Sequence, residues 1–182
     1  MDKAMLNLSR AERRFWLRWT LATMGCIALA TLIGPFGFLG GFVPLATLQW
    51  LALRGYWPQA RYWFWATLVG GGLGTVAMVF GFLVTASAVG GAAIAAAVQG
   101  MAQAIALRGS SRHWRWWPLI NMAILVPTTT WAVSQGIQAS FSGSAINPWW
   151  FWSALGLGTG LVGGAIKGLA LILMLRAPAP RT

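Results

Sequence analysis

The sequence predicts an all-α integral membrane protein whose six transmembrane helices form three tandem helical hairpins within one membrane domain, residues 1–182. Composition, the placement of the basic residues and an internal repeat lead to this fold class. Hydrophobic residues make up 58% of the chain and charged residues 8%, whereas a soluble domain carries about 25% charged residues. So few charges cannot cover a water-exposed surface, and a single cysteine excludes a disulfide-stapled domain.

Six apolar runs define the predicted helices, because about 20 helical residues cross a bilayer. The first run also has the layout of a signal peptide, with Ala28-Leu29-Ala30 as its cleavage site. We reject that interpretation, since removing the segment would leave five helices and break the repeat described below. The six predicted helices cover Phe15–Ile33, Phe38–Leu53, Tyr62–Thr85, Ala88–Leu107, Trp116–Gln138 and Trp149–Leu175.

The basic residues test this helix count. If six helices alternate across the membrane, 12 of the 13 Lys and Arg residues fall on one side, and Lys167 is left within a helix. Positive residues stay on the cytoplasmic side of membrane segments, so both termini are expected to be cytoplasmic. The basic residues are dispersed between apolar runs, which argues against nucleic-acid binding despite the net charge of +11.

An internal repeat relates the hairpins. Each odd predicted helix opens with Arg, an aromatic residue and Trp, and each even one ends in Leu-Arg. Seven identities recur at a constant offset of 54 residues, among them Gln49/Gln103 and Trp63/Trp117. These features predict hairpin repeats at about 14–54, 61–108 and 115–176. Arginine and tryptophan at helix ends are typical of membrane interfaces, so anchoring is the expected role of most tryptophans.

These residues also carry a resemblance. The string Gln49-Trp50-Leu51-Ala52-Leu53-Arg54 followed by Tyr62-Trp63, together with the closing segment 164–176, resembles a group of uncharacterised bacterial, notably cyanobacterial, multi-pass membrane proteins with Q-W-L-x-L-R repeats. The resemblance covers most of the chain and implies topology without an established activity. It also implies the bacterial cytoplasmic (inner) membrane, or the thylakoid membrane in a cyanobacterium. Two departures are the missing Trp after Gln103 and Lys167 in place of a small or hydroxyl residue.

Small residues predict close packing of the last helix. A glycine recurs there every four residues, which lets two backbones approach where the hydrophobic effect between helices is weak. We expect this ladder to pack within the chain, with a contact between subunits as the alternative. Its members are Gly156, Gly160, Gly164 and Gly168.

The sequence contains no pattern typical of an enzyme or a metal site. Asp2 and Glu12 both precede the first predicted helix, so no paired carboxylates are available for acid–base chemistry. His113 has no acid or cysteine near it in sequence, and is either a solvated loop residue or an axial ligand to a chlorophyll or haem. We therefore predict a protein that is not an enzyme and requires no cofactor, with chlorophyll, carotenoid or lipid as candidate ligands.

Polar residues at membrane depth are the remaining candidates for ligand or partner contact. Lys167 lies nine residues before Arg176, and Gln99 lies nine before Arg108 at the matching depth. Either Lys167 extends to the cytoplasmic headgroups and the amides bond to other helices, or they line a site for an anionic headgroup, cofactor or partner carboxylate. The candidates are Lys167, Gln99, Gln103, Gln49, Asn121 and His113.

These features favour an accessory, structural or assembly subunit of a larger membrane complex, such as a photosynthetic or respiratory one. Its expected partners are the lipid bilayer and other membrane subunits. The alternative is a small-molecule binding or transport module. Six helices with both ends inside resemble the substrate-binding subunits of energy-coupling-factor vitamin importers, and Gly34-Pro35-Phe36-Gly37 resembles a turn of the biotin type.

Overall fold

The computed structural model describes residues 8–33, 41–141 and 149–176, and every regular element in these ranges is helical. The predicted all-helical class is therefore confirmed. Six α-helices and a short 3-10 helix follow one another along the chain. Their bounds are α1 (Arg10–Ile33), α3 (Phe42–Leu53), α4 (Ala60–Thr85), α5 (Ala88–Leu107), η2 (Trp114–Trp116), α6 (Trp117–Phe141) and α7 (Trp149–Arg176).

Three helices are long and apolar enough to cross a membrane: Ala60–Thr85, Val89–Leu107 and Gly156–Arg176. By contrast, α3 has 12 residues, which is a rise of about 18 Å at about 1.5 Å per residue. It is shorter than the hydrocarbon core of a bilayer, about 30 Å. The predicted helix 38–53 begins at residues 38–40, which lie outside the described ranges. Six crossings and the side of the termini stay predictions.

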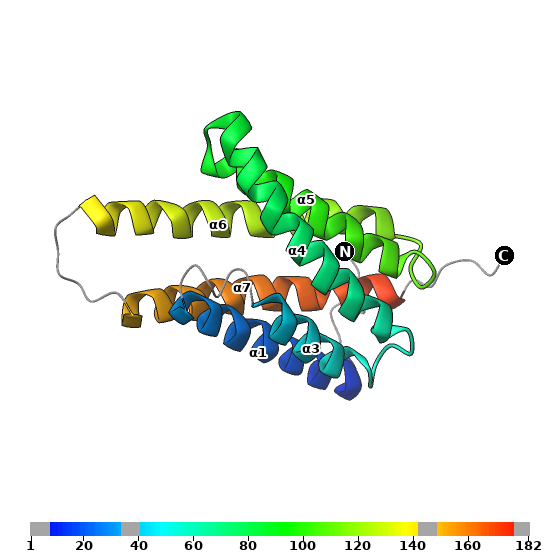
Figure 1. The fold of residues 1–182 in the computed structure, drawn as a ribbon. Helices are drawn as coiled ribbons and strands as arrows, with labels where there is room; N and C mark the ends of the chain where they lie inside the picture. The colour runs from blue at the N-terminus through cyan, green and yellow to red at the C-terminus, as the bar shows by residue number, and fades with distance from the viewer. Residues whose placement is uncertain (1–7, 34–40, 142–148, 177–182) are drawn as a thin grey trace, which may run out of the picture.

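The helices alternate in direction. As a result, α1, α4 and α6 begin, and α3, α5 and α7 end, at the same end of the molecule, on the right in Figure 1. We call this the basic end, because Arg54, Arg61, Arg108, Arg115 and Arg176 lie there. Each helix contacts the next along the chain, and α7 packs along α1 to close the ring.

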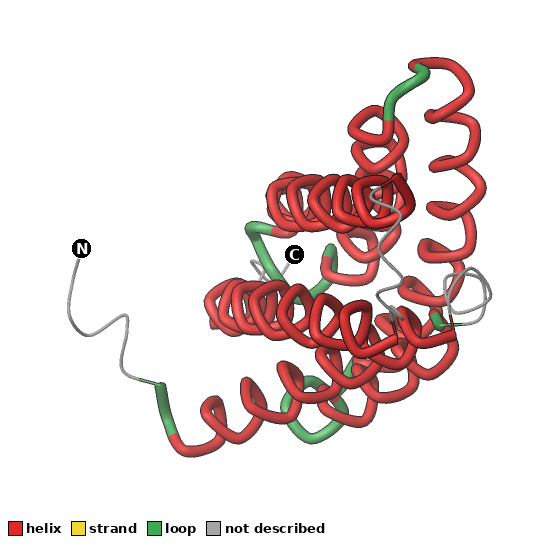
Figure 2. The backbone as a smooth tube through the Cα atoms, turned by 90° about the vertical axis from the view of Figure 1, so that its left-hand side faces the viewer, coloured by secondary structure: helices red, strands yellow, loops and turns green. Residues whose placement is uncertain are grey.

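The arrangement opens away from the basic end. The α4–α5 hairpin leaves the other helices at an angle and extends beyond them (Figures 1 and 2). Its two helices pack closely against each other, whereas α6 and α7 contact each other far less. The hairpin turns at Ala86, whose φ of 49° is left-handed. Ser87 then caps α5 by accepting a hydrogen bond from the Gly90 N–H.

The two turns at the basic end have the same geometry. The carbonyl oxygen of Leu53 accepts hydrogen bonds from the N–H groups of Tyr56 and Trp57. The carbonyl oxygen of Leu107 accepts the same pair of bonds from Ser110 and Ser111. Both leucine side chains are fully buried. The 54-residue repeat therefore recurs as equivalent backbone contacts in these two turns.

Candidate functional site: a tryptophan centre joined by glutamines

Three tryptophans meet near the basic end, one each from α1, α4 and α6. Trp19, Trp63 and Trp117 are all 0% exposed. Trp63 makes T-shaped ring contacts with both of the others, at centroid distances of 5.5 Å to Trp19 and 5.3 Å to Trp117. This geometry is favoured by the ring quadrupoles. The sequence-based alignment paired Trp16 with Trp63, but in the structure Trp19 holds that place and Trp16 donates a hydrogen bond to the Ala165 carbonyl.

Two buried glutamines join the tryptophan centre to neighbouring helices. Gln49 accepts a hydrogen bond from the Trp63 indole N–H at 3.0 Å and donates one to the Thr23 hydroxyl at 3.3 Å. Gln103 accepts from Trp117 at 2.9 Å and donates to the Thr67 hydroxyl at 3.0 Å. Each amide thus links the first helix of its own hairpin to the first helix of the next.

We call these sets Trp–Gln–Thr units. The first unit contains Trp63, Gln49 and Thr23, and the second contains Trp117, Gln103 and Thr67. In both units the tryptophan follows the glutamine by 14 residues. Both glutamines, which were predicted as candidate contacts, are therefore occupied within the chain. This outcome matches the simpler of the two alternatives for the amides, in which they bond to other helices.

The third equivalent position lacks the glutamine. Leu171 stands five residues before Arg176, as Gln49 and Gln103 stand before their arginines, and it is 0% exposed. Trp19 precedes Thr23 by four residues and Asn121 follows Trp117 by four, as Thr67 follows Trp63. Trp19 and Asn121 are therefore the equivalents of the donor and the acceptor in the complete units, and we call Leu171, Trp19 and Asn121 the third unit. The Trp19 indole nitrogen and the Asn121 Oδ1 are buried without a hydrogen-bond partner among the described residues. These are the donor and the acceptor that a glutamine would serve.

The other predicted contact residues lie outside the units. Asn121 donates from Nδ2 to the Ala96 carbonyl on α5 at 3.0 Å. Gln99 packs on α4, where a Cβ placed at Gly74 would lie 3.7 Å from its Cβ. Lys167 is half-buried on α7, and His113 is half-buried just before η2. Among the described residues, no side-chain hydrogen bond or ion pair joins Lys167, Gln99 or His113 to another side chain, so a shared polar pocket is not assembled from them.

The glycine ladder of α7 packs against α1, which is the arrangement expected from the sequence. A Cβ placed at Gly160 would lie 2.6 Å from the Cα of Met24, and one at Gly164 would lie 3.0 Å from the Thr23 Cβ. At Gly168 the neighbour is the Trp19 ring, 2.8 Å away. Backbone contact of this kind requires glycine, so three of the four ladder positions hold α7 on α1. Gly156 is also buried.

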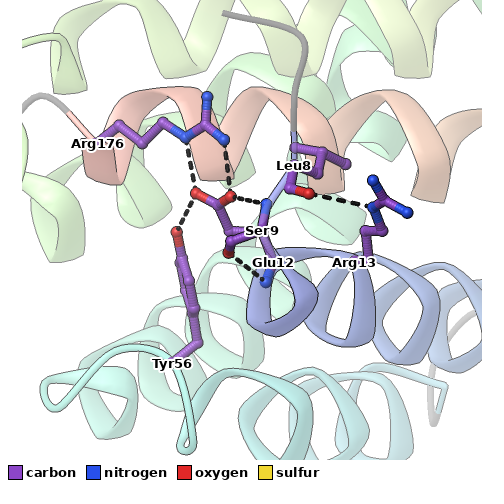
Figure 3. Close-up of polar contacts among 6 residues, drawn as sticks. All are labelled: Leu8, Ser9, Glu12, Arg13, Tyr56 and Arg176. Atoms are coloured by element: carbon purple, nitrogen blue, oxygen red, sulfur yellow. Dashed lines mark hydrogen bonds and ion pairs between the residues drawn. The ribbon is translucent and has the colours of Figure 1, made fainter. Parts of the chain in front are cut away.

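An ion pair that the sequence-based reasoning missed joins the two ends of the helical ring (Figure 3). Arg176 donates from Nε and from its terminal nitrogen to the two oxygens of Glu12, each at 2.7 Å. Glu12 also accepts from the Ser9 backbone N–H at 2.7 Å, and the Ser9 hydroxyl accepts from the Glu12 N–H at 3.2 Å. This capping box explains why α1 begins at Arg10, before the predicted start at residue 15.

The ion pair controls the protonation of Glu12, which is 7% exposed. The hydrogen bond from Arg176 lowers the pKa of the Glu12 carboxyl from 4.5 to about 2, and the Ser9 hydrogen bonds act in the same direction against the effect of burial. Tyr56 donates to the same carboxylate at 3.4 Å. The pattern Ser9-x-x-Glu12 could have indicated the cap, but the partner 164 residues away is defined only by the tertiary fold.

The arrangement is suited to holding helices together. Its glutamine, threonine and tryptophan groups are neutral, and the carboxylate is already paired with Arg176. Within the described residues, no group of three or more His, Cys, Asp or Glu side chains could hold a metal ion. Comparison with known proteins adds no candidate chemistry: no family model, no curated protein and no solved structure matches this chain.

Proposed function

We propose that the protein is an integral membrane protein with six helices in the membrane, of which the short α3 spans only part of the bilayer, and with both termini at the cytoplasmic face. In this proposal it serves, without catalysis, as an accessory or assembly subunit of a larger membrane complex. The observation that carries the proposal is the apolar, projecting α4–α5 hairpin (Figure 1). Near its tip Val84 is 81% exposed, Leu83 69% and Phe80 64%. Apolar surface of this extent fits lipid or the apolar helices of a partner.

The internal packing of the hairpin supports this role. A Cβ placed at Gly70 would lie 2.7 Å from the Ala102 Cβ, and one at Gly81 would lie 3.0 Å from the Gly91 Cα. The two helices are therefore in near-backbone contact, and they hold each other in place without help from the rest of the ring. A rigid hairpin that presents apolar side chains is well suited to insertion between other membrane subunits.

The alternative, a small-molecule binding or transport module, has less support. Such a module needs space between its helices for a ligand. At the basic end that space is filled by Trp19, Trp63 and Trp117, which contact one another and are fully buried. The Trp–Gln–Thr units fix these rings further, because each indole N–H of Trp63 and Trp117 is already bonded.

Cysteine labelling tests the proposed topology. In a Cys26→Ala background, a cysteine replaces Gly55 at the basic end or Ala86 at the hairpin tip, both of which are exposed. Nothing lies within 4 Å of a Cβ at Gly55. An impermeant thiol reagent added outside intact cells should label Ala86→Cys and leave Gly55→Cys unlabelled. The opposite pattern would contradict the proposal.

Native purification tests the subunit role. Membranes are solubilised in mild detergent, and co-purifying membrane proteins are quantified by mass spectrometry. The double variant Leu83→Ser/Val84→Ser should release a stoichiometric partner, because it removes exposed apolar surface from the hairpin tip. Leu161→Ser/Val162→Ser removes the same kind of surface from α7 and should keep the partner. A monomer in the unmodified protein, or equal loss in both variants, would contradict the subunit role.

A further inference from the structure

The seam between α6 and α7, that is, the line along which the two helices contact, has a larger residue at a position where the seam between α4 and α5 has glycine. Gly70 on α4 lets Ala102 of α5 pack directly against it. At the equivalent position, 54 residues later, α6 carries Ile124, and Ala170 on α7 corresponds to Ala102, six residues before the terminal arginine. Ile124 is 8% exposed and approaches the position of a Cβ at Gly163 to 3.3 Å. At this position the seam therefore holds a branched side chain where the α4–α5 seam has direct backbone contact.

A groove of about 260 Å³ lies along the α6–α7 seam at the basic end. Its walls are apolar except at the loop before η2, and its lining residues are His113, Trp116, Ile120, Ala170, Leu173 and Met174. Trp116 is 61% exposed and Leu173 is 41% exposed, so the groove opens to the outside of the ring. In a membrane that outside is lipid.

Two basic residues are close in sequence to the lining residues of the groove. Arg112 directly precedes His113, Arg115 lies in η2 directly before Trp116, and both arginines are exposed. Glu12, the one acid among the described residues, is already paired with Arg176. A ligand that complements this surface therefore carries a negative charge at one end and an alkyl chain at the other.

We propose that the α6–α7 groove binds one anionic phospholipid, with an acyl chain between Ile120 and Leu173 and its phosphate at Arg112, Arg115 and His113. This inference rests on the membrane location in the proposed function. Arginine binds phosphate through charge-assisted hydrogen bonds, and basic pockets between membrane helices on the cytoplasmic side bind anionic headgroups.

Native mass spectrometry of the full chain in detergent, titrated with phosphatidylglycerol or phosphatidylcholine, tests the proposal. One phosphatidylglycerol should be retained at concentrations where phosphatidylcholine is lost. Leu173→Trp fills the groove and should abolish this retention. Ile105→Trp places the same side chain on α5, also three residues before the terminal arginine and exposed, and should retain the lipid as the unmodified protein does.

The headgroup contact has its own test. Arg112→Gln/Arg115→Gln should weaken phosphatidylglycerol retention about fivefold for each charge removed and leave phosphatidylcholine unchanged. Arg54→Gln/Arg61→Gln removes two charges from the other basic turn and should have little effect. Equal loss in both pairs, equal retention of the two lipids, or retention unaffected by Leu173→Trp would overturn the proposal. A pigment with visible absorption that is lost in Leu173→Trp would overturn it as well.

Failure of this proposal is distinguishable from failure of the proposed function. If the lipid tests fail while the partner still co-purifies and the labelling pattern holds, only the phospholipid site is rejected. If Ala86→Cys is not labelled from outside or the protein is extracted from membranes without detergent, the membrane location itself is rejected.

Discussion

The first two Trp–Gln–Thr units and the third unit show two ways to join neighbouring hairpins. In the first two, a buried amide bridges a hydroxyl on one side and an indole N–H on the other. In the third, Leu171 replaces the amide and leaves Trp19 Nε1 and Asn121 Oδ1 without partners among the described residues. At this junction α7 instead contacts α1 through glycines. Glycine contact is thus found where the buried amide is missing, beside the Trp16–Ala165 hydrogen bond and the ion pair of Glu12 with Arg176.

Replacing the amide with leucine in the third unit costs stability and changes which residues the unit depends on. Each buried polar group without a partner costs about 1–3 kcal/mol, and close backbone contact offsets part of this loss through dispersion. The third unit should therefore depend on its glycines and tolerate polar change, whereas the first two should depend on their glutamines. Four variants test that difference.

The largest effect is expected from Gly160→Leu. A Cβ at this position would lie 2.6 Å from the Met24 Cα, so the leucine must push α7 away from α1 and break the contact that closes the ring. We expect a loss of about 3 kcal/mol in the free energy of unfolding, measured by chemical denaturation in detergent. Gly158→Leu on the same helix is the control, because nothing lies within 4 Å of its Cβ position. Equal losses in the two variants would show that the ladder does not close the ring.

The next largest effect is expected from Gln103→Leu, which converts the second unit into a copy of the third. It leaves the Trp117 indole N–H and the Thr67 hydroxyl without their present bonds, and a leucine side chain can replace neither bond. The expected loss is about 2 kcal/mol, seen together with a shift in the fluorescence of Trp117. Gln99→Leu should cost less, since Gln99 has no side-chain hydrogen bond to another described side chain. A larger loss in Gln99→Leu would contradict the assignment.

The reverse change, Leu171→Gln, should complete the third unit. The new amide could accept from Trp19 and donate to Asn121, as the existing glutamines do with their neighbours. We expect a gain of about 1 kcal/mol in the free energy of unfolding. Leu171→Met is the control, because it has a similar volume and cannot make these bonds. If methionine stabilises the protein as much as glutamine does, the two orphaned groups are not the cause.

The two complete units could have been predicted from the sequence, because the 54-residue offset aligns Gln49 with Gln103 and Trp63 with Trp117. Because the glutamine and the tryptophan recur together, the hydrogen bond between them could have been expected to recur as well. The third unit could not be predicted, since Trp16 and Trp19 both lie among the arginines at the start of the first helix and only packing distinguishes them. Trp19 is 0% exposed, whereas Trp16 is half-buried.

The start of α1 also shows which contacts the sequence can reveal and which depend on the tertiary fold. The apolar run predicted α1 from residue 15, but Ser9 and Glu12 cap it at Arg10. That cap can be predicted from the sequence, because it depends on the local pattern Ser-x-x-Glu. The ion pair between Glu12 and Arg176 is different, because it joins residues at opposite ends of the chain. Only the closure of α7 on α1 brings them together.

The last variant, Glu12→Gln, tests whether the ion pair reinforces that closure. Because folding lowers the pKa of Glu12 from 4.5 to about 2, its contribution to stability is fully present above pH 4.5. It is lost as the pH falls toward about 2, when the carboxylate takes up a proton in the folded state too. The unmodified protein should therefore show a thermal midpoint that falls between pH 5 and pH 2.5, about the interval over which such a carboxylate titrates.

Glu12→Gln should begin from a lower midpoint at pH 7 and change less over the same interval, because glutamine cannot titrate. Asp2→Asn provides the control, since it removes the chain's other acid and leaves the pair with Arg176 intact. Glu12→Gln also keeps a side chain that can accept from the Ser9 N–H, so a loss of pH dependence belongs to the charge of the carboxylate, whose pKa Arg176 lowers most. A midpoint in Glu12→Gln that falls as steeply as in the unmodified protein would show that the pH dependence comes from another group and that glycine contact alone closes the ring.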